Sequence, residues 1–160
     1  MGYRDKAIFV APVGIDEGWS VEDRVDMAIR SEALMKKLGC GNVRIAVMSG
    51  GRDEDLGRLD VVDETIADAM EIVKRLNKKG YDAYDAQILL EDAVDEADLI
   101  IAPNGITGNL IFRTMHFIGN APAFGAPLIN TDKVFVDTSR VKTDFTDSII
   151  LAMKLVGMKE

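Results

Sequence analysis

Short apolar runs alternate along the chain with longer segments in which apolar residues recur at helical spacing. The short runs predict strands at residues 7–11, 43–48, 81–88, 99–102 and 134–136. The longer segments predict helices at residues 20–38, 62–76, 91–97, 110–118 and 147–155, with loops at residues 103–109 and 119–127. This alternation predicts an α/β protein with a doubly wound, mainly parallel sheet and helices on both faces. Asp82 and Asp85 place the third strand at a sheet edge.

The first predicted helix has clear ends and two apolar sides. Ser20 and Asp23 resemble a capping box, and Gly39 is a stop signal. The two apolar lines are Val21, Val25, Ala28 and Met35, and then Met27, Leu34 and Leu38. Because one sheet face covers only one line, we expect the second line and apolar parts of residues 119–127 to be buried by self-association about a two-fold axis. The chain is therefore predicted to be a homo-oligomer.

Composition and charge exclude some classes of binding partner and indicate the cellular compartment. The 160 residues suffice for one domain and carry 19 basic and 27 acidic side chains, a net charge of −8. Binding to a nucleic-acid backbone needs clustered positive charge, so nucleic acid is not an expected partner. The single cysteine, Cys40, reads as a structural thiol and fits a reducing compartment. No apolar run is long enough for a membrane span and no secretion leader is present, so we expect a cytoplasmic single domain over residues 1–160.

Polar residues and glycines follow four of the predicted strands. In parallel α/β sheets, ligands bind beyond the carboxyl ends of the strands, where loop amides and helix N-termini converge. We therefore expect the four clusters to share one sheet edge and to form a cradle for phosphate or another anion. The clusters are Gly14, Asp16, Glu17 and Gly18; Ser49, Gly50, Gly51 and Arg52; Asn104, Gly105, Thr107, Gly108 and Asn109; and Asp137, Thr138, Ser139 and Arg140.

Each cluster also has a purely structural interpretation. Residues 49–52 taken alone are typical of an ordinary turn or loop after a strand. Asn104 fits a local turn and Asn109 fits a helix cap, although two glycines and two asparagines in six residues exceed what one turn requires. The pair at residues 139–140 fits a surface ion pair equally well, and the acidic residues 144 and 147 fit a helix N-terminus.

The remaining chemistry-bearing residues give weaker signals. His116, the single histidine, lies on the polar side of its helix and is interpreted as a solvated or interface residue. A Ser-His-Asp triad would have to use it, and no G-x-S-x-G elbow exists. One histidine and one cysteine do not suffice for a structural zinc site, so no metal is expected; magnesium at Asp53–Asp55 is the open alternative. Neither a Walker loop nor a G-x-G-x-x-G motif occurs.

Several motifs resemble the C-terminal half of the phosphate acetyl/butyryltransferases. That family has an F-P-N-x-x-x-G-N element, then I-G-P, then D-L-S-R-G with an acidic pair before a helix. The matching segments here are residues 102–109, 125–127, 136–140 and 147–149. Within this superfamily, which also contains the fatty-acid enzyme PlsX, residues 11–18 and 105–114 resemble the methanogenesis marker protein 4 (MtxX-like) group. The resemblance implies the second-domain fold of the phosphotransacetylases and an archaeal methanogen source.

The resemblance also implies roles for individual residues. Ser139 would hydrogen-bond the reacting thiol or carbonyl, and Arg140 would bind phosphate or coenzyme A with its guanidinium fork. Asp147 would be the base that takes the thiol proton, with Asp144 competing for that role because the spacing is one residue longer here. Val141 stands where the family has glycine. No tightly bound cofactor is expected; coenzyme A or phosphate would be the ligand.

Two hypotheses follow for the function. The first is a phosphotransacetylase-like protein that binds a phosphate, acyl-phosphate or coenzyme A ligand and acts as an acyltransferase. The second is a non-catalytic accessory subunit associated with methanogenesis or methyl transfer, since MtxX-type proteins are labelled methyltransferase-related. Family enzymes form their cleft between two domains, and this chain matches only one. A separate chain that supplies the first domain is therefore an expected partner.

Overall fold

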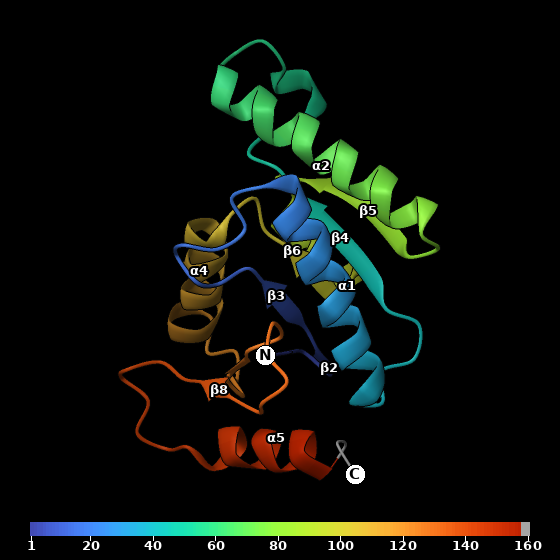
Figure 1. Ribbon diagram of the computed structural model, residues 1–160. Coiled ribbons are helices and arrows are strands. Elements are labelled where there is room, and N and C mark those ends of the chain that lie inside the picture. Colours follow the sequence, from blue (N-terminus) through green and yellow to red (C-terminus); the bar gives the residue numbers. More distant parts are fainter. Residues whose placement is uncertain (158–160) are drawn as a thin grey trace.

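Four of the five predicted strands form one parallel sheet, and the fifth, predicted at residues 134–136, lies outside it. The computed structural model describes residues 1–157 (Figure 1). The strands are β3 (Phe9–Ala11), β4 (Arg44–Met48), β5 (Asp82–Gln87) and β6 (Leu99–Ile101), in the order β3-β6-β4-β5 with every pair parallel. The edge position predicted for the third strand is confirmed, because β5 pairs only with β4. Non-consecutive neighbours require crossover connections, which the helices supply.

Helices cover both faces of this sheet, as the doubly wound prediction requires. Core residues of α1 (Val21–Lys37) and α2 (Asp60–Lys78) pack with Ile45 and Val47 of β4 on one face. Those of α3 (Leu90–Glu96) and α4 (Gly105–Arg113) pack with Ala46 and Met48 on the other. Successive side chains of a strand point to opposite faces, which explains this division. The central strand β6 is apolar throughout and fully buried, as expected for a strand covered on both sides.

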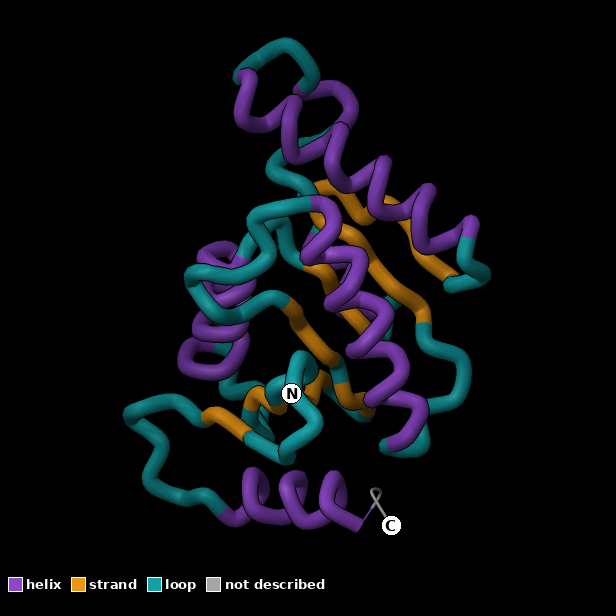
Figure 2. The backbone as a smooth tube through the Cα atoms, viewed as in Figure 1, coloured by secondary structure: helices purple, strands orange, loops and turns teal. Residues whose placement is uncertain are grey.

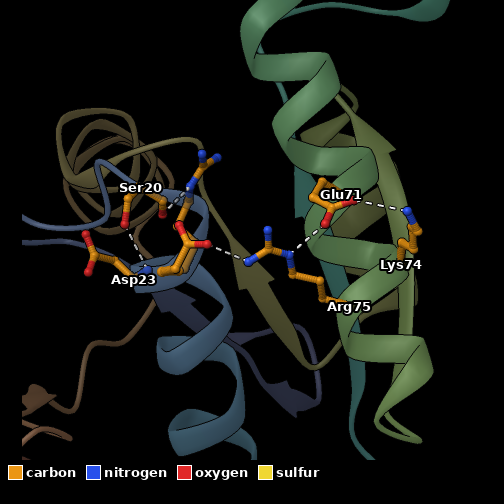
Figure 3. A network of polar contacts seen from close by, with 7 residues as sticks. Ser20, Asp23, Glu71, Lys74 and Arg75 are labelled. Carbon is orange, nitrogen blue, oxygen red and sulfur yellow. Dashed lines mark hydrogen bonds and ion pairs between the residues drawn. The ribbon is translucent and has the colours of Figure 1, made fainter.

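The start of α1 is fixed by its cap and by an ion pair to α2. The Ser20 hydroxyl accepts a hydrogen bond from the Asp23 backbone N–H at 3.1 Å, which confirms Ser20 as the N-cap. The return bond to the Asp23 carboxylate that would complete the predicted capping box does not occur among the described residues. Arg75 of α2 donates to Glu71 of its own helix at 2.7 Å and to Glu22 of α1 at 2.6 Å. Figure 3 shows its guanidinium group between the two helices.

A buried arginine joins the same two helices. Arg24 of α1 is only 2% exposed, and its Nη2 pairs with Asp68 of α2. Its Nη1 is buried without a hydrogen-bond partner. A buried charge is stabilised only when it is paired, so Asp68 is what makes this position tolerable in the core.

The surface proposed for self-association differs from the prediction. The second apolar line of α1 is half-buried rather than bare at Met27, Leu34 and Leu38. Within residues 119–127, Ala121 is buried. The α1 line is therefore not the exposed apolar patch that we expected. The exposed large apolar side chains lie instead chiefly in the loops before α1 and α2, on α2, on α4 and the turn after it, and in the last thirty or so described residues.

The ends of the chain form two small hairpins outside the main sheet (Figure 2). At the amino end, β1 (Gly2–Tyr3) pairs with β2 (Lys6–Ala7), so the strand predicted at residues 7–11 begins only at Phe9 in the sheet. Near the carboxyl end, β7 (Ala126–Pro127) pairs with β8 (Val136–Asp137), so residues 119–127 are not wholly irregular. The final helix is α5 (Thr146–Gly157), which lies beyond β8 and away from the four-stranded sheet.

The loop predicted at residues 103–109 is also corrected. Asn104 is the N-cap of α4, and the helix begins at Gly105. It continues into a π-helical turn, η2 (Thr114–Ile118), whereas the sequence predicted a regular helix at residues 110–118. The motif that carried the predicted ligand residues is thus the first turn of a helix.

Candidate functional site

The loops after β3 and β6 do meet at the carboxyl edge of the sheet, and glycine makes their contact possible. A Cβ at Gly105 would lie 1.5 Å from the carbonyl oxygen of Gly14, and one at Gly108 would lie 1.8 Å from that of Pro12. Neither position tolerates a side chain without displacement of backbone. The two glycines are therefore explained by close packing of α4 on the loop after β3.

The polar residues of this motif are engaged in the same contact. Asn104 Oδ1 accepts from Thr107 N at 2.9 Å and from Thr107 Oγ1 at 3.1 Å. Asn109 Nδ2 donates to the Val13 carbonyl at 2.9 Å, and Gly105 N donates to the Glu17 carbonyl at 3.0 Å. The donors that we expected to bind an anion are thus hydrogen-bonded within the protein, those of Thr107 to the Asn104 side chain and those of Asn109 and Gly105 to backbone carbonyls. Their ligand-binding role stays a prediction.

The cluster after β4 is likewise closed on itself. Ser49 Oγ donates to the Gly51 carbonyl at 2.8 Å, Gly50 N donates to Thr65 Oγ1 at 2.8 Å, and Arg52 N donates to Asp55 Oδ2 at 3.0 Å. Only Gly50 of this cluster lines a hollow, of about 390 Å³, with Asp55, Arg58, Leu59 and Val62. Asp55 is ion-paired with Arg58 there. These contacts match the structural interpretation of residues 49–52.

The fourth cluster does not share this edge. The predicted convergence of four clusters is wrong, because β8 pairs with β7 and with no strand of the parallel sheet. Ser139 lines a hollow beside the π-helical turn at His116, twelve residues beyond Asn104 along the helix. At a helical rise of about 1.5 Å per residue, that is about 15–18 Å from the start of α4. The two arginines expected in one cradle, Arg52 and Arg140, belong to separate regions.

The hollow at the end of α4 brings together residues that the sequence treated separately. It has a volume of about 270 Å³ and is lined by His116, Phe117, Ser139, Val141, Lys142, Thr143 and Asp144. Two of the four predicted catalytic residues, Ser139 and Asp144, line it. Arg140 and Asp147 do not, and both are exposed. Their predicted roles are thus not placed at this hollow.

Lys142 and His116 are the lining residues that sequence reasoning missed. Lys142 Nζ donates to the Ala123 carbonyl at 3.1 Å and to Ser148 Oγ at 2.8 Å, which holds the lining loop against residues 119–127 and α5. His116 Nδ1 lies 2.7 Å from the Ala121 carbonyl. The only sequence signal for His116 was its being the single histidine.

The environment of Asp144 makes it a weak base. Hydrogen bonds from the Thr146 hydroxyl at 2.7 Å and the Thr146 backbone N–H at 2.9 Å hold the pKa of Asp144 below its usual range. The carboxylate thus caps the first turn of α5. A general base works best when its pKa lies near the working pH, and the lowered pKa of Asp144 moves it away from that range.

A further acidic residue lies at the carboxyl end of β5. Burial raises the pKa of Asp85, against the hydrogen bond that its carboxylate accepts from Gln87 N at 2.8 Å, while the charge of Asp53 raises it further. Gln87 adopts a left-handed backbone with φ of 54°, at a register shift between β4 and β5. The sequence marked Asp85 only as an edge signal.

Residues 1–157 contain no group of three side chains able to hold a metal ion. Over the same residues, no helix combines the length and apolar character needed to cross a membrane.

Sequence comparison finds curated relatives in methanogens, and no protein-family model matches the chain. The chain is 48% identical over 147 residues to a protein of Methanosarcina acetivorans named "Putative methyltransferase mtx subunit X", covering 92% of this chain and 52% of that protein. It is 34% identical over 157 residues to an uncharacterized methyltransferase of Methanopyrus kandleri, covering 95% and 61%. The chain thus spans about half the length of the curated relatives it matches.

Comparison of folds finds phosphotransacetylases. A branched-chain phosphotransacylase from Enterococcus faecalis aligns with a TM-score of 0.70 at 16% identity, covering 92% of this chain and 57% of that one. The EutD phosphotransacetylase from Staphylococcus aureus aligns with a TM-score of 0.65 at 16% identity, covering 94% and 49%. At such identities the likeness establishes the fold alone. Both parts of the expected resemblance, in sequence and in fold, are confirmed.

Proposed function

We propose that this chain, which is MtxX-like in sequence and has the fold of the phosphotransacetylases, is one part of a two-part protein that binds an acyl phosphate, inorganic phosphate or coenzyme A. The observation that carries the proposal is the hollow at the end of α4, where Ser139 and Asp144 meet Lys142 and His116. Of the four residues for which the resemblance implies catalytic roles, Ser139 and Asp144 line this hollow.

The lining groups suit an anionic acyl or phosphoryl ligand. The Ser139 hydroxyl supplies a donor and an acceptor, and the Lys142 ammonium supplies a positive charge that balances the Asp144 carboxylate. Arg140 does not line the hollow, but it follows Ser139 directly and is exposed, so we propose that its guanidinium group turns towards a phosphate bound there. Asp144 contributes to the local geometry through Thr146 rather than as a base.

The open side of the hollow supports a second part. Its volume of about 270 Å³ is close to the lower end of the roughly 300–1,000 Å³ usual for small-molecule pockets, but it is open to solvent. We infer that another wall comes from the portion of its relatives' length that this chain does not span. Nearby α5 exposes Ile149, Ile150, Met153 and Val156, which such a partner would cover.

Calorimetric titration tests the binding proposal directly. The chain should bind coenzyme A or inorganic phosphate, and Arg140→Lys should weaken binding, because a point charge does not reproduce the bidentate fork. Arg30→Lys is the matched control, since Arg30 is exposed on α1 and pairs only with Asp26. Absence of binding to both ligands would refute the proposal. Formation of acetyl phosphate from acetyl-coenzyme A, assayed with and without the remaining half of a full-length relative, then tests for acyl transfer.

A second function is supported by a different observation. Curated relatives carry the name of a methyltransferase subunit, and the exposed face of α5 suits a protein partner. As an alternative, we propose a non-catalytic accessory subunit of a methyl-transferring complex. This alternative predicts a stoichiometric complex with purified methyltransferase subunits that Ser139→Ala and Arg140→Lys leave intact. Loss of the complex in those variants would favour the ligand-binding function instead.

A further inference from the structure

His116 stands in the π-helical turn that ends α4 and lines the same hollow as Ser139. π-Helical turns within α-helices are rare and occur often at functional sites. Its ring stacks on Phe112, with 5.5 Å between ring centroids and 19° between ring planes. The centroid of the Phe117 ring lies 4.6 Å from that of the imidazole. The imidazole is therefore held in one orientation by its neighbours.

The hydrogen bond at Nδ1 decides which ring nitrogen carries the proton. Nδ1 lies 2.7 Å from the Ala121 carbonyl oxygen, which can only accept. The proton of the neutral ring must therefore be on Nδ1, and the lone pair is on Nε2. Nε2 has no hydrogen-bond partner within the described part of the chain. His116, which lines the hollow, thus carries an acceptor nitrogen that no described group uses.

The carboxylates implied by the family resemblance are less suited to accept a proton here. Asp144 lines the hollow, but its carboxylate is taken by Thr146, which lowers its pKa. Asp147 is exposed in the first turn of α5 and does not line the hollow. His116, in contrast, lines the hollow and carries on Nε2 a lone pair that no described group uses.

We propose that His116, through Nε2, is the proton acceptor for a thiol bound beside Ser139. The inference rests on the proposed acyl-transfer function and names the group that acts in it. The S–H bond of the thiol breaks and its proton moves to Nε2. The sulfur electron pair then forms a bond to the acyl carbon, and the bond from that carbon to the phosphate oxygen breaks, with the phosphate leaving with its electron pair. The imidazolium keeps Nδ1–H on the Ala121 carbonyl throughout.

The charged groups around His116 are few and already engaged. Lys142 and Asp144 face it from the lining loop, bound to Ser148 and Thr146 respectively. Arg113, on its own helix, stacks over the Phe117 ring at 5.1 Å. Since Asp144 and Lys142 carry opposite charges, the loop adds no net charge to the hollow.

Nitrogen NMR of the single histidine tests the proposal on the chain itself. At pH 8 we expect the free protein to show Nδ1 protonated and Nε2 unprotonated. Coenzyme A should shift the Nε2 resonance, whereas an analogue that lacks the thiol should bind without that shift. His116→Asn keeps a donor near Nδ1 and removes Nε2, so it should weaken coenzyme A binding about 3–10-fold, the loss of one hydrogen bond, and leave analogue binding unchanged.

The outcomes separate this inference from the function on which it rests. If coenzyme A binds and the Nε2 resonance does not move, His116 is not the acceptor, although the binding function stands. A free protein with Nε2 protonated and Nδ1 bare would also overturn the inference. If neither coenzyme A nor phosphate binds, both proposals fall. Because the NMR experiment uses the wild-type chain, it decides the question even if His116→Asn fails to fold, which circular dichroism would reveal.

In a reconstituted enzyme, His116→Asn should reduce the rate of acyl transfer to coenzyme A by about 10²–10⁴-fold, the usual contribution of a general base. The pH profile of the rate should differ between the wild-type enzyme and His116→Asn, because the variant lacks the group that takes the proton. An unchanged profile in the variant would assign proton acceptance to another group.

Discussion

Arg75 bridges two glutamates that belong to different helices. Its hydrogen bonds are the main reason why the pKa values of Glu22 and Glu71 lie below their usual range. A carboxyl group whose pKa is lowered by folding stabilises the native state above its unfolded pKa, and this stabilisation is lost as the pH falls through the folded value. The contribution of Arg75 is therefore present at neutral pH and disappears in acid.

Arg75→Gln should lower the urea midpoint at pH 7 and have progressively less effect below about pH 4.5, where the glutamates of the unfolded chain are already protonated. High salt should also shrink the difference, because all three side chains are exposed enough to be screened. Lys37→Gln, on the last turn of α1, is the control. A deficit of Arg75→Gln that persists unchanged at pH 2.5 would contradict this account.

Residue identity alone revealed only part of the candidate site. In the sequence, Gly105, Gly108 and Asn109 belong to a segment with more glycine and asparagine than one turn requires. In the structure each of the three contacts the backbone of the loop after β3. Those backbone groups belong to residues 12–17, about 90 positions earlier, so no local pattern could show that the motif packs on backbone. The place of His116 depends equally on a tertiary contact, because Ser139 reaches it from a separate hairpin.

At the scale of elements, α4 is held against the loop after β3 by two glycines. Ala at Gly108 would place a methyl group 1.8 Å from the Pro12 carbonyl oxygen, and Ala at Gly105 would place one 1.5 Å from that of Gly14. Overpacking of this kind typically costs about 1–3 kcal/mol, and more when backbone must move.

Gly108→Ala and Gly105→Ala should therefore each lower the free energy of unfolding by at least about 2 kcal/mol, as measured by urea denaturation. Gly41→Ala provides the comparison, since nothing lies within 4 Å of a Cβ there. Equal stability of all three variants would mean that α4 does not approach the loop closely.

The elements with strong periodicity were predictable, and the others were not. Helix-ending signals and a regular apolar stripe predicted α1 and α2, and continuous apolar runs predicted β4 and β6. The start of α4 was missed because Asn104 and Gly105 are also turn residues, and here Asn104 serves as a cap. The strand β8 has two residues, too few for any period, so its pairing with β7 could not be read from sequence.

At the scale of the whole molecule, the last helix, α5, packs against little of the rest of the chain. Of the described residues in α5, only Ser148 and Leu155 are buried, and its contacts are chiefly with β8. Ile149, Met153 and Val156 recur at helical spacing on its exposed side. An apolar stripe of this kind favours contact with another surface.

In isolation the chain should therefore self-associate through α5, as light scattering at increasing concentration would show. Ile149→Glu combined with Met153→Glu should shift the protein towards monomer, because charges in the stripe oppose its burial. Leu34→Glu, on the half-buried line of α1, should instead reduce stability. Adding the remaining half of a full-length relative should abolish self-association of the wild-type chain. A wild-type monomer at tens of micromolar would count against this use of α5.

The order of strands in the sheet has a consequence for the route by which the chain folds. β3 is the first of the four sheet strands in the sequence but pairs only with β6, so that Phe9 lies opposite Leu99. The contacts between β4, α2 and β5 close over much shorter stretches of chain, and loop-closure entropy favours their early formation. During synthesis, β3 must therefore wait without a sheet partner until ninety further residues have been made. The sheet strand that is synthesised first is therefore among the last to be paired.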